Sequence, residues 1–213
     1  NVLNFALKKN AKILFTSTSE VYGDPEVHPQ PESYRGSVNP IGVRACYDEG
    51  KRCAESLFYD FQRMHGLEIR VARLFNTYGP LMRSDDGRVV SNFICQSILD
   101  HPITMYGDGS QTRSFCHVDD LIRGLQLLMN TESNILHPVN LGNPGEFTLL
   151  ELVNQIELIT EKKLQVEFLP LPLDDPKKRK PDISVAMQKL EWEPSISLKD
   201  GLKDTYEYFQ NQL

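Results

Sequence analysis

Tyr47 and Lys51 have the types and the spacing of a proton acceptor assisted by a cation. They lie four residues apart, so on a helix both side chains project from one face and the ammonium group can lie beside the phenol. A fixed positive charge favours the ionised phenol, which can then take a proton from a substrate hydroxyl. Both residue types are common, so the spacing alone leaves two interpretations open: a catalytic pair, or an exposed pair on an amphipathic helix.

A second polar group lies upstream, where the apolar run from Ile13 ends in Thr18, Ser19 and Glu20. The run has the length and composition of a buried parallel strand. In open α/β sheets, ligands bind at the carboxyl ends of such strands. A strand followed by an ordinary Ser/Thr turn would show the same sequence pattern. The presence of Tyr47 and Lys51 downstream favours a ligand-binding site at the strand end.

With both stretches present in this order, the chain resembles the extended short-chain dehydrogenase/reductase family of nucleotide-sugar enzymes. Within that family it is similar to the group that decarboxylates UDP-glucuronate. The resemblance covers nearly all 213 residues, and it rests on these segments: S-T-S-E-V-Y-G-D-P, N-P-I-G-V-R-A-C-Y-D-E-G-K-R, R-L-F-N-T-Y-G-P, D-G-R-V-V-S-N-F, Y-G-D-G-S-Q-T-R, V-N-L-G-N-P and R-K-P-D-I.

The resemblance implies an α/β fold: the C-terminal part of a Rossmann-type doubly wound parallel sheet plus a small α/β substrate-binding domain. Residues 1–80 would belong to the NAD-binding domain. Residues 81–213 would mainly form the substrate domain, with 114–147 returning to the first. The residue patterns predict helices over 1–9, 44–65, 89–99, 119–129 and 148–160 and one from residue 198, and strands over 12–18, 68–74, 103–106, 137–141 and 164–169. An irregular connection rich in Pro, Gly and Asn is expected over 19–42. Leu57 and Phe58 are expected on the apolar face of the helix 44–65, and Thr148 with Glu151 is expected to form a capping box.

A glycine-rich turn of the G-x-G-x-x-G type, which opens dinucleotide-binding domains, does not occur in the sequence. We therefore expect this chain to be a fragment that lacks the first βα units of its domain.

The composition is that of a globular protein, with 40% hydrophobic and 24% charged residues and a net charge of −6, which argues against nucleic acid as a partner. No apolar run reaches the roughly 18 residues that span a bilayer, and we expect no signal peptide at the start of the chain. The four cysteines lack zinc-site spacing, so we expect reduced thiols, no metal and a cytoplasmic location.

The resemblance also implies ligands and residues that bind them. It implies NAD as cofactor, UDP-glucuronate as substrate, and a homodimer formed through the helix that carries Tyr47 and Lys51. The expected NAD-binding residues are Ser17, Thr18, Tyr47, Lys51, Thr77 and Arg88. The expected substrate-binding residues are Ser19, Asn76, Val89, Phe93, Tyr106, Gln111, Arg113 and Arg179. Arg113 could be a solvated loop charge, or it could pair with the diphosphate or hold the nucleotide ribose. The basic run 177–180 could be a solvated face or a localisation signal, although its Arg179 suits a sugar carboxylate.

Catalysis is expected from Thr18, Glu20, Tyr47, Lys51 and Arg179. In this family Tyr47 would take the proton of the sugar 4-hydroxyl during oxidation at C4, aided by Thr18. The dehydratases of the family carry an aspartic acid at the position of Ser19. A serine hydroxyl is a poor acid, so elimination of water is disfavoured here. The 4-epimerases have no counterpart of Glu20. Decarboxylation to UDP-xylose is therefore expected, with a related epimerase or dehydratase, or an inactive binding or dimerisation module, as alternatives.

Overall fold

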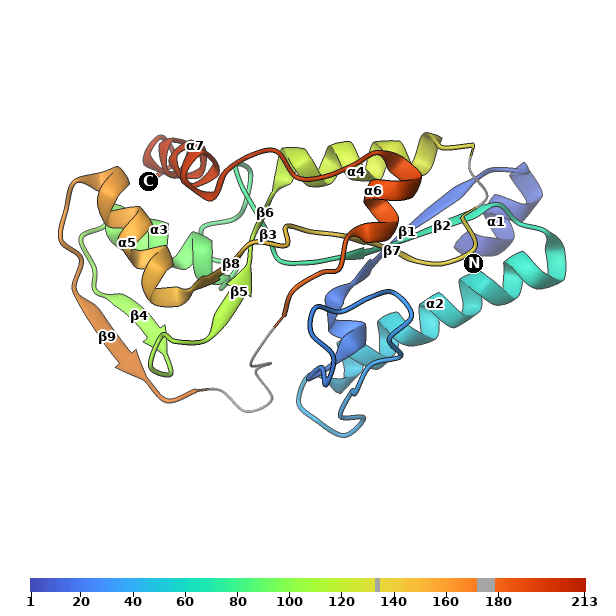
Figure 1. Cartoon of the computed structure of the whole chain (residues 1–213), viewed down its shortest axis with the longest axis horizontal. Helices are drawn as coiled ribbons and strands as arrows, with labels where there is room; N and C mark the ends of the chain where they lie inside the picture. The colour runs from blue at the N-terminus through green and yellow to red at the C-terminus, as the bar shows by residue number, and fades with distance from the viewer. Residues whose placement is uncertain (133–134, 172–178) are drawn as a thin grey trace.

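The computed structural model describes residues 1–132, 135–171 and 179–213. Its centre is a parallel sheet of three strands in the order β1-β2-β7 (Figure 1). The strands are β1 (Ile13–Thr18), β2 (Ile69–Leu74) and β7 (Val139–Leu141). β1 pairs with β2 over its whole length, from Ile13 opposite Ile69 to Thr18 opposite Leu74. The polar residues that follow β1 and β2 therefore emerge at the same edge of the sheet.

Helices cover both faces of this sheet. One face packs against α1 (Val2–Lys9) and α2 (Ala45–His65), with Phe58 of α2 meeting Ile69 and Val71 of β2. The other face packs against α4 (Val118–Asn130) and α6 (Ser184–Leu190), where Ala72 joins the fully buried Trp192. Neighbouring residues of β2 thus face opposite layers, as the alternation of side chains along a strand requires.

The second lobe contains α3 (Val89–Ile98), α5 (Leu149–Thr160) and α7 (Leu198–Gln210), whose apolar faces share one core (Figure 1). Its strands are β4 (Ile103–Tyr106) with β9 (Val166–Leu169), and β5 (Thr112–Ser114) with β8 (Glu146–Thr148). β3 (Thr77–Tyr78) pairs with β6 (Cys116–His117) beside α4. The expected capping box of α5 is present, because Thr148 and Glu151 each accept a hydrogen bond from the other's backbone N–H.

Several expectations of the sequence need correction. The connection expected to be irregular from Ser19 begins with a 3-10 helix, η1 (Ser19–Tyr22). Leu57 is 49% exposed, whereas it was expected on the apolar face of α2 with Phe58. α6 and Trp192 pack on the sheet formed by β1, β2 and β7. The predicted domain division itself stays a prediction. Lys177 and its neighbours 172–178 lie outside the described residues.

No helix in the described ranges has the length and apolar character needed to cross a membrane.

Two helical glycines differ in their surroundings and make a matched test of packing. A Cβ at Gly201 of α7 would lie 2.2 Å from the Tyr78 hydroxyl oxygen, whereas a Cβ at Gly50 of α2 would meet no atom within 4 Å. We expect Gly201→Ala to lower the free energy of unfolding by about 1–3 kcal/mol through overpacking. Gly50→Ala should raise it by about 0.5–1 kcal/mol through the lower backbone entropy of unfolded alanine. Urea unfolding of both variants would check this, and equal effects would contradict the packing of α7 against Tyr78.

Candidate active site

Tyr47 and Lys51 lie in the first two turns of α2 and have the expected arrangement. The Lys51 ammonium nitrogen is 5.8 Å from the centre of the Tyr47 ring. It donates a hydrogen bond of 2.8 Å to the backbone carbonyl of Thr16, which fixes it against β1. The Tyr47 side chain is 47% exposed, so its hydroxyl is accessible to a ligand. Strand β1 therefore holds the cation in place beside an accessible phenol.

Tyr22 is another tyrosine near this edge of the sheet, and it is unsuited to proton transfer. It is fully buried, donates a hydrogen bond to Asn140 and accepts one from Arg73. Burial raises the pKa of Tyr22 to about 12 in spite of the Arg73 charge. Tyr22 is therefore closed to a ligand, whereas Tyr47 is exposed.

The residues that end β1 are ordered by the start of η1. The Thr18 hydroxyl accepts a hydrogen bond of 3.2 Å from the backbone N–H of Glu20, which begins the 3-10 turn. Thr18 and Ser19 are 8% and 2% exposed. Glu20 consequently turns away from the strand axis toward α2 and toward the C-terminal segment around Arg179.

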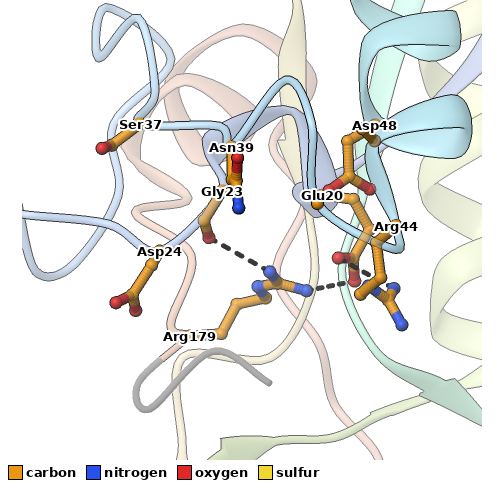
Figure 2. A pocket seen from close by; sticks show the side chains of 10 residues that line it. Glu20, Gly23, Asp24, Ser37, Asn39, Arg44, Asp48 and Arg179 are labelled. Carbon is orange, nitrogen blue, oxygen red and sulfur yellow. Dashed lines mark hydrogen bonds and ion pairs between the residues drawn. The ribbon is translucent and has the colours of Figure 1, made fainter. Parts of the chain in front are cut away.

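Glu20 lies between two arginines. Its carboxylate accepts a short hydrogen bond from Arg179 and forms an ion pair of 3.0 Å with Arg44 (Figure 2). Burial by itself would raise the pKa of Glu20, but the charges and hydrogen bonds of Arg179 and Arg44 outweigh it and lower the pKa. Glu20 is therefore held as a carboxylate.

These groups line a pocket of about 110 Å³ at the carboxyl end of β1. Figure 2 shows Arg179 reaching across it toward Glu20 and the carbonyl of Gly23, with Arg44 and Asp48 on the side of α2. Its lining residues are Glu20, Gly23, Asp24, Ser37, Asn39, Gly42, Arg44, Ala45, Asp48 and Arg179. A polar cavity with two guanidinium groups suits an anionic ligand.

The connection that follows β1 holds the segment containing Arg179 in place. Gln30 is fully buried, accepts a hydrogen bond at its side-chain oxygen from the Lys180 backbone, and exchanges backbone hydrogen bonds with Lys180 and Asp182. Gly23 supports the same arrangement with φ +63°, where a Cβ would lie 2.0 Å from the Ser37 carbonyl oxygen. The connection thus positions Arg179 against Glu20.

The predicted NAD-binding residues differ in whether their polar groups already have partners within the chain. Ser17 is buried, and its hydroxyl donates to the Glu55 carboxylate at 2.6 Å, so that hydroxyl is already engaged. Thr77 lies in β3 and donates its hydroxyl to the Phe75 carbonyl. Arg88 is exposed at the start of α3, 3.5 Å from Asp86. Contacts of these residues with NAD stay predictions.

The predicted substrate-binding residues of the second lobe are dispersed around α3, β4 and β5. Asn76 lies at the end of β2, and Val89 begins α3. Phe93 is 2% exposed in the core of the second lobe, a position that gives no support to its predicted contact with substrate. Tyr106 is 45% exposed, and its carbonyl accepts a hydrogen bond from Gln111. Arg113, half-buried in β5, donates to the Thr112 carbonyl. None of these six lines the pocket at Glu20.

Arg44 and Asp48 were given no role from the sequence, although both lie in a segment that carried the resemblance. They stand three residues before and one residue after Tyr47. On a helix, Asp48 and Tyr47 point about 100° apart, so Asp48 turns into the pocket while Tyr47 stays accessible. Helical geometry could have flagged Asp48, whereas the contact of Arg44 with Glu20 depends on how the connection folds.

No group of three or more His, Cys, Asp or Glu side chains within the described ranges is arranged to hold a metal ion.

The parallel sheet with helices on both faces and with polar side chains at the carboxyl ends of its strands is a Rossmann-type fold. The profile of the NAD dependent epimerase/dehydratase family matches residues 1–142, and the chain belongs to this family.

Curated relatives and solved structures extend this likeness over the whole chain. The chain is 56% identical over all 213 residues to UDP-glucuronic acid decarboxylase 1 of Arabidopsis thaliana and 54% identical to UDP-glucuronic acid decarboxylase 1 of Danio rerio, covering 48% and 50% of those proteins. It thus spans about half their length. UDP-glucuronic acid 4-epimerase from Bacillus cereus, crystallised with UDP-glucuronic acid and NAD, superimposes with a TM-score of 0.89 at 30% identity, over all of this chain and 66% of that one. UDP-glucose 4-epimerase from Thermotoga maritima gives 0.91 at 30% identity, over 99% and 67%.

Proposed function

We propose that this chain forms the catalytic part of an NAD-dependent enzyme that decarboxylates UDP-glucuronate to UDP-xylose through a 4-keto sugar. The observation that carries the proposal is the pocket in which Arg179 and Arg44 converge on Glu20, beside the end of β1. Two guanidinium groups can bind a substrate that carries a carboxylate. The identity of 56% to a UDP-glucuronic acid decarboxylase over the whole chain supports the choice of reaction.

Tyr47, Lys51 and Thr18 would act at the sugar 4-hydroxyl. Tyr47 takes the hydroxyl proton, while the Lys51 ammonium, fixed on the Thr16 carbonyl, stabilises the phenolate. Thr18 is 8% exposed at the strand end and would orient the hydroxyl. The accessible phenol and the fixed ammonium fit a nicotinamide cofactor bound beside them, and Lys51 would also bind its ribose. A bound NAD would supply a hydride acceptor for the oxidation at C4 and, once reduced, the hydride donor for the closing reduction.

Ser19 and Glu20 favour loss of carbon dioxide over loss of water. Ser19 is buried and has no acidic proton for a departing 6-hydroxyl. Glu20 is held as a carboxylate, so it cannot donate a proton either. A carboxylate on C6, placed beta to the C4 ketone, leaves without acid assistance because the ketone accepts the electron pair. Arg179, which cannot be deprotonated, binds and orients this carboxylate but does not reprotonate C5.

The reaction can be tested with UDP-glucuronate labelled at C6, with and without added NAD. We expect labelled carbon dioxide, with UDP-xylose as the sugar product. Carbon dioxide with a 4-keto pentose as the final product would keep the site but remove the return reduction.

A 4-epimerase is the second candidate, since two solved neighbours at 30% identity are epimerases. Conversion of UDP-glucuronate to a 4-epimer without labelled carbon dioxide would support it. Binding of UDP-sugars without turnover would support an inactive binding or dimerisation module.

We also propose a homodimer formed through α2. Cys53, Leu57 and Met64 lie on one stripe of this helix, and all three are exposed, Leu57 at 49% and Met64 at 74%. An exposed apolar stripe on a helix is typical of an association surface. Light scattering should give twice the monomer mass, and a monomer at all concentrations would contradict the proposal.

We further propose a cytoplasmic location. The four free cysteines, two of them exposed, support a reducing compartment. Fractionation of cells that produce the protein would test the location.

A further inference from the structure

Asp48 is a buried carboxylate with an unsatisfied oxygen. Its side chain is 8% exposed, and within the described part of the chain its Oδ1 atom has no hydrogen-bond partner. Buried polar atoms are nearly always paired, because an unpaired one loses its hydration without compensation. Asp48 also lines the pocket that contains Glu20, Arg44 and Arg179 (Figure 2). No group in the described residues compensates this buried oxygen, and a proton on Asp48 would remove the cost of keeping it charged.

The surroundings of Asp48 shift its pKa in the direction opposite to that of Glu20. Burial raises the pKa of Asp48, and the charge of Glu20 raises it further, with a smaller contribution from Glu49. Arg44 and Arg179 lower the pKa of Asp48, but by less than burial and Glu20 raise it. Both arginines are ion-paired with Glu20, where their effect outweighs burial and lowers the pKa. Two carboxylates whose environments displace their pKa values in opposite directions divide the acid and base roles. Glu20 is the ionised member, and Asp48 is the member that can hold a proton.

The proposed reaction consumes one proton that the substrate does not bring. When the C5–C6 bond breaks, its electron pair moves into the C4 ketone as an enolate, and the carboxylate leaves as neutral carbon dioxide. The proton that Tyr47 takes from the 4-hydroxyl returns to the 4-oxygen when C4 is reduced, so a separate proton must form the new C5–H bond. Arg44 and Arg179 cannot release a proton, and Glu20 has none. The two remaining charged residues of the pocket lining are Asp24 and Asp48. Asp24 is exposed to solvent, whereas Asp48 is buried, so the geometry favours Asp48 as the source of the proton.

We propose that Asp48 takes up this proton when the substrate carboxylate enters the pocket, and that it passes the proton through pocket water beside Glu20 to C5. The incoming carboxylate adds a negative charge, which makes protonation of Asp48 more favourable. The pocket of about 110 Å³ has room for water, which occupies about 30 Å³ per molecule in the liquid. Solvent then reprotonates Asp48. This inference rests on the proposed function, and it makes Asp48 a proton relay that acts through pocket water.

Proton uptake on binding tests the inference without turnover. The NAD-bound protein carrying Tyr47→Phe, which blocks oxidation, would be titrated with UDP-glucuronate in weak buffer containing a pH indicator. We expect uptake of about one proton per site near neutral pH. UDP-glucose, which lacks the carboxylate, should cause none. Asp48→Asn should abolish the uptake, whereas Glu49→Gln should retain it, because Glu49 lies next on α2 but outside the pocket lining and pairs with Arg52.

Incorporation of deuterium at C5 from heavy water tests the delivery step in the enzyme with Tyr47 intact. Asp48→Asn should slow it by about 100-fold, the lower range for loss of a general acid. The rate in the unmodified enzyme should fall as rising pH removes the Asp48 proton, and the variant should lose this limb. Asp48→Glu should restore part of the rate. The carboxyl carbon resonance of Asp48 in the Tyr47→Phe protein reports the same protonation without altering Asp48.

The outcomes separate the two proposals. If the unmodified enzyme releases carbon dioxide but Asp48→Asn takes up the proton and labels C5 at the normal rate, the relay is overturned and the proposed function stands. If the unmodified enzyme releases no carbon dioxide, the proposed function falls, and delivery of the proton to C5 falls with it.

Discussion

Replacing Tyr47 by phenylalanine is expected to lower the rate of carbon dioxide release from UDP-glucuronate by about 1,000-fold. The variant keeps the ring that packs beside Lys51 and removes only the oxygen that accepts the proton of the 4-hydroxyl. Lys51 stays anchored on the Thr16 carbonyl, so the geometry of α2 and β1 should not change. C4 oxidation precedes decarboxylation, and both should therefore fail together. Release of label from C6 and the absorbance of NADH would measure the two steps in one experiment.

Tyr59→Phe is the matched control for this prediction. Tyr59 lies on the same helix, and it is partly buried against the core formed with α1. Its substitution removes the same atom from α2 at a distance of twelve residues from Tyr47, and we expect ordinary turnover. A Tyr47→Phe enzyme that keeps more than about a tenth of the rate would exclude Tyr47 as the base, since loss of a general base costs at least about 100-fold.

The local geometry of the site could be predicted from the sequence because it depends on regular periodicity. The spacing of Tyr47 and Lys51 fixed their common face as soon as a helix was assigned. The position of Thr18 at a strand end followed from one apolar run. The contact of Glu20 with Arg179 could not be predicted, because 159 residues separate them and the connection through Gln30 has no regular pattern. Arg179 was expected to meet the substrate carboxylate, and in the structure it meets Glu20.

In the fold, too, regular elements could be predicted and features set by distant contacts could not. Long elements such as α2 and α5 were predicted within one or two residues, because periodicity and caps are strong over several turns. The predicted strand from His137 is shorter, beginning at Val139. The short strands β3, β5, β6 and β8 and the seven-residue helix α6 were missed. Elements of two to seven residues carry too few side chains to show a period, and their pairing is set by tertiary contacts.

The buried ion pair of Glu55 and Arg73, next to β1, is the feature that the sequence patterns indicated least. Glu55 of α2 and Arg73 of β2 would each be taken for a solvent-facing charge, yet their side chains are 10% and 12% exposed. Glu55 accepts two hydrogen bonds from Arg73 and one from Ser17. Arg73 also donates to the Tyr22 hydroxyl and the Glu32 carbonyl. The network therefore ties the end of β1 to α2 and to the connection that supports the pocket.

Loss of Arg73 from this network is expected to be the most damaging single change to stability. Arg73→Met should lower the free energy of unfolding by about 3–5 kcal/mol, because it leaves the Glu55 carboxylate buried without its cation. Glu55→Gln in the same protein should recover most of this loss, since a neutral amide still accepts the Ser17 hydroxyl hydrogen bond and carries no charge to bury. Urea unfolding of both single variants and the double variant closes a cycle that measures the coupling directly. Additive effects of the two substitutions would show that the Glu55–Arg73 pair does not hold the end of β1 against α2.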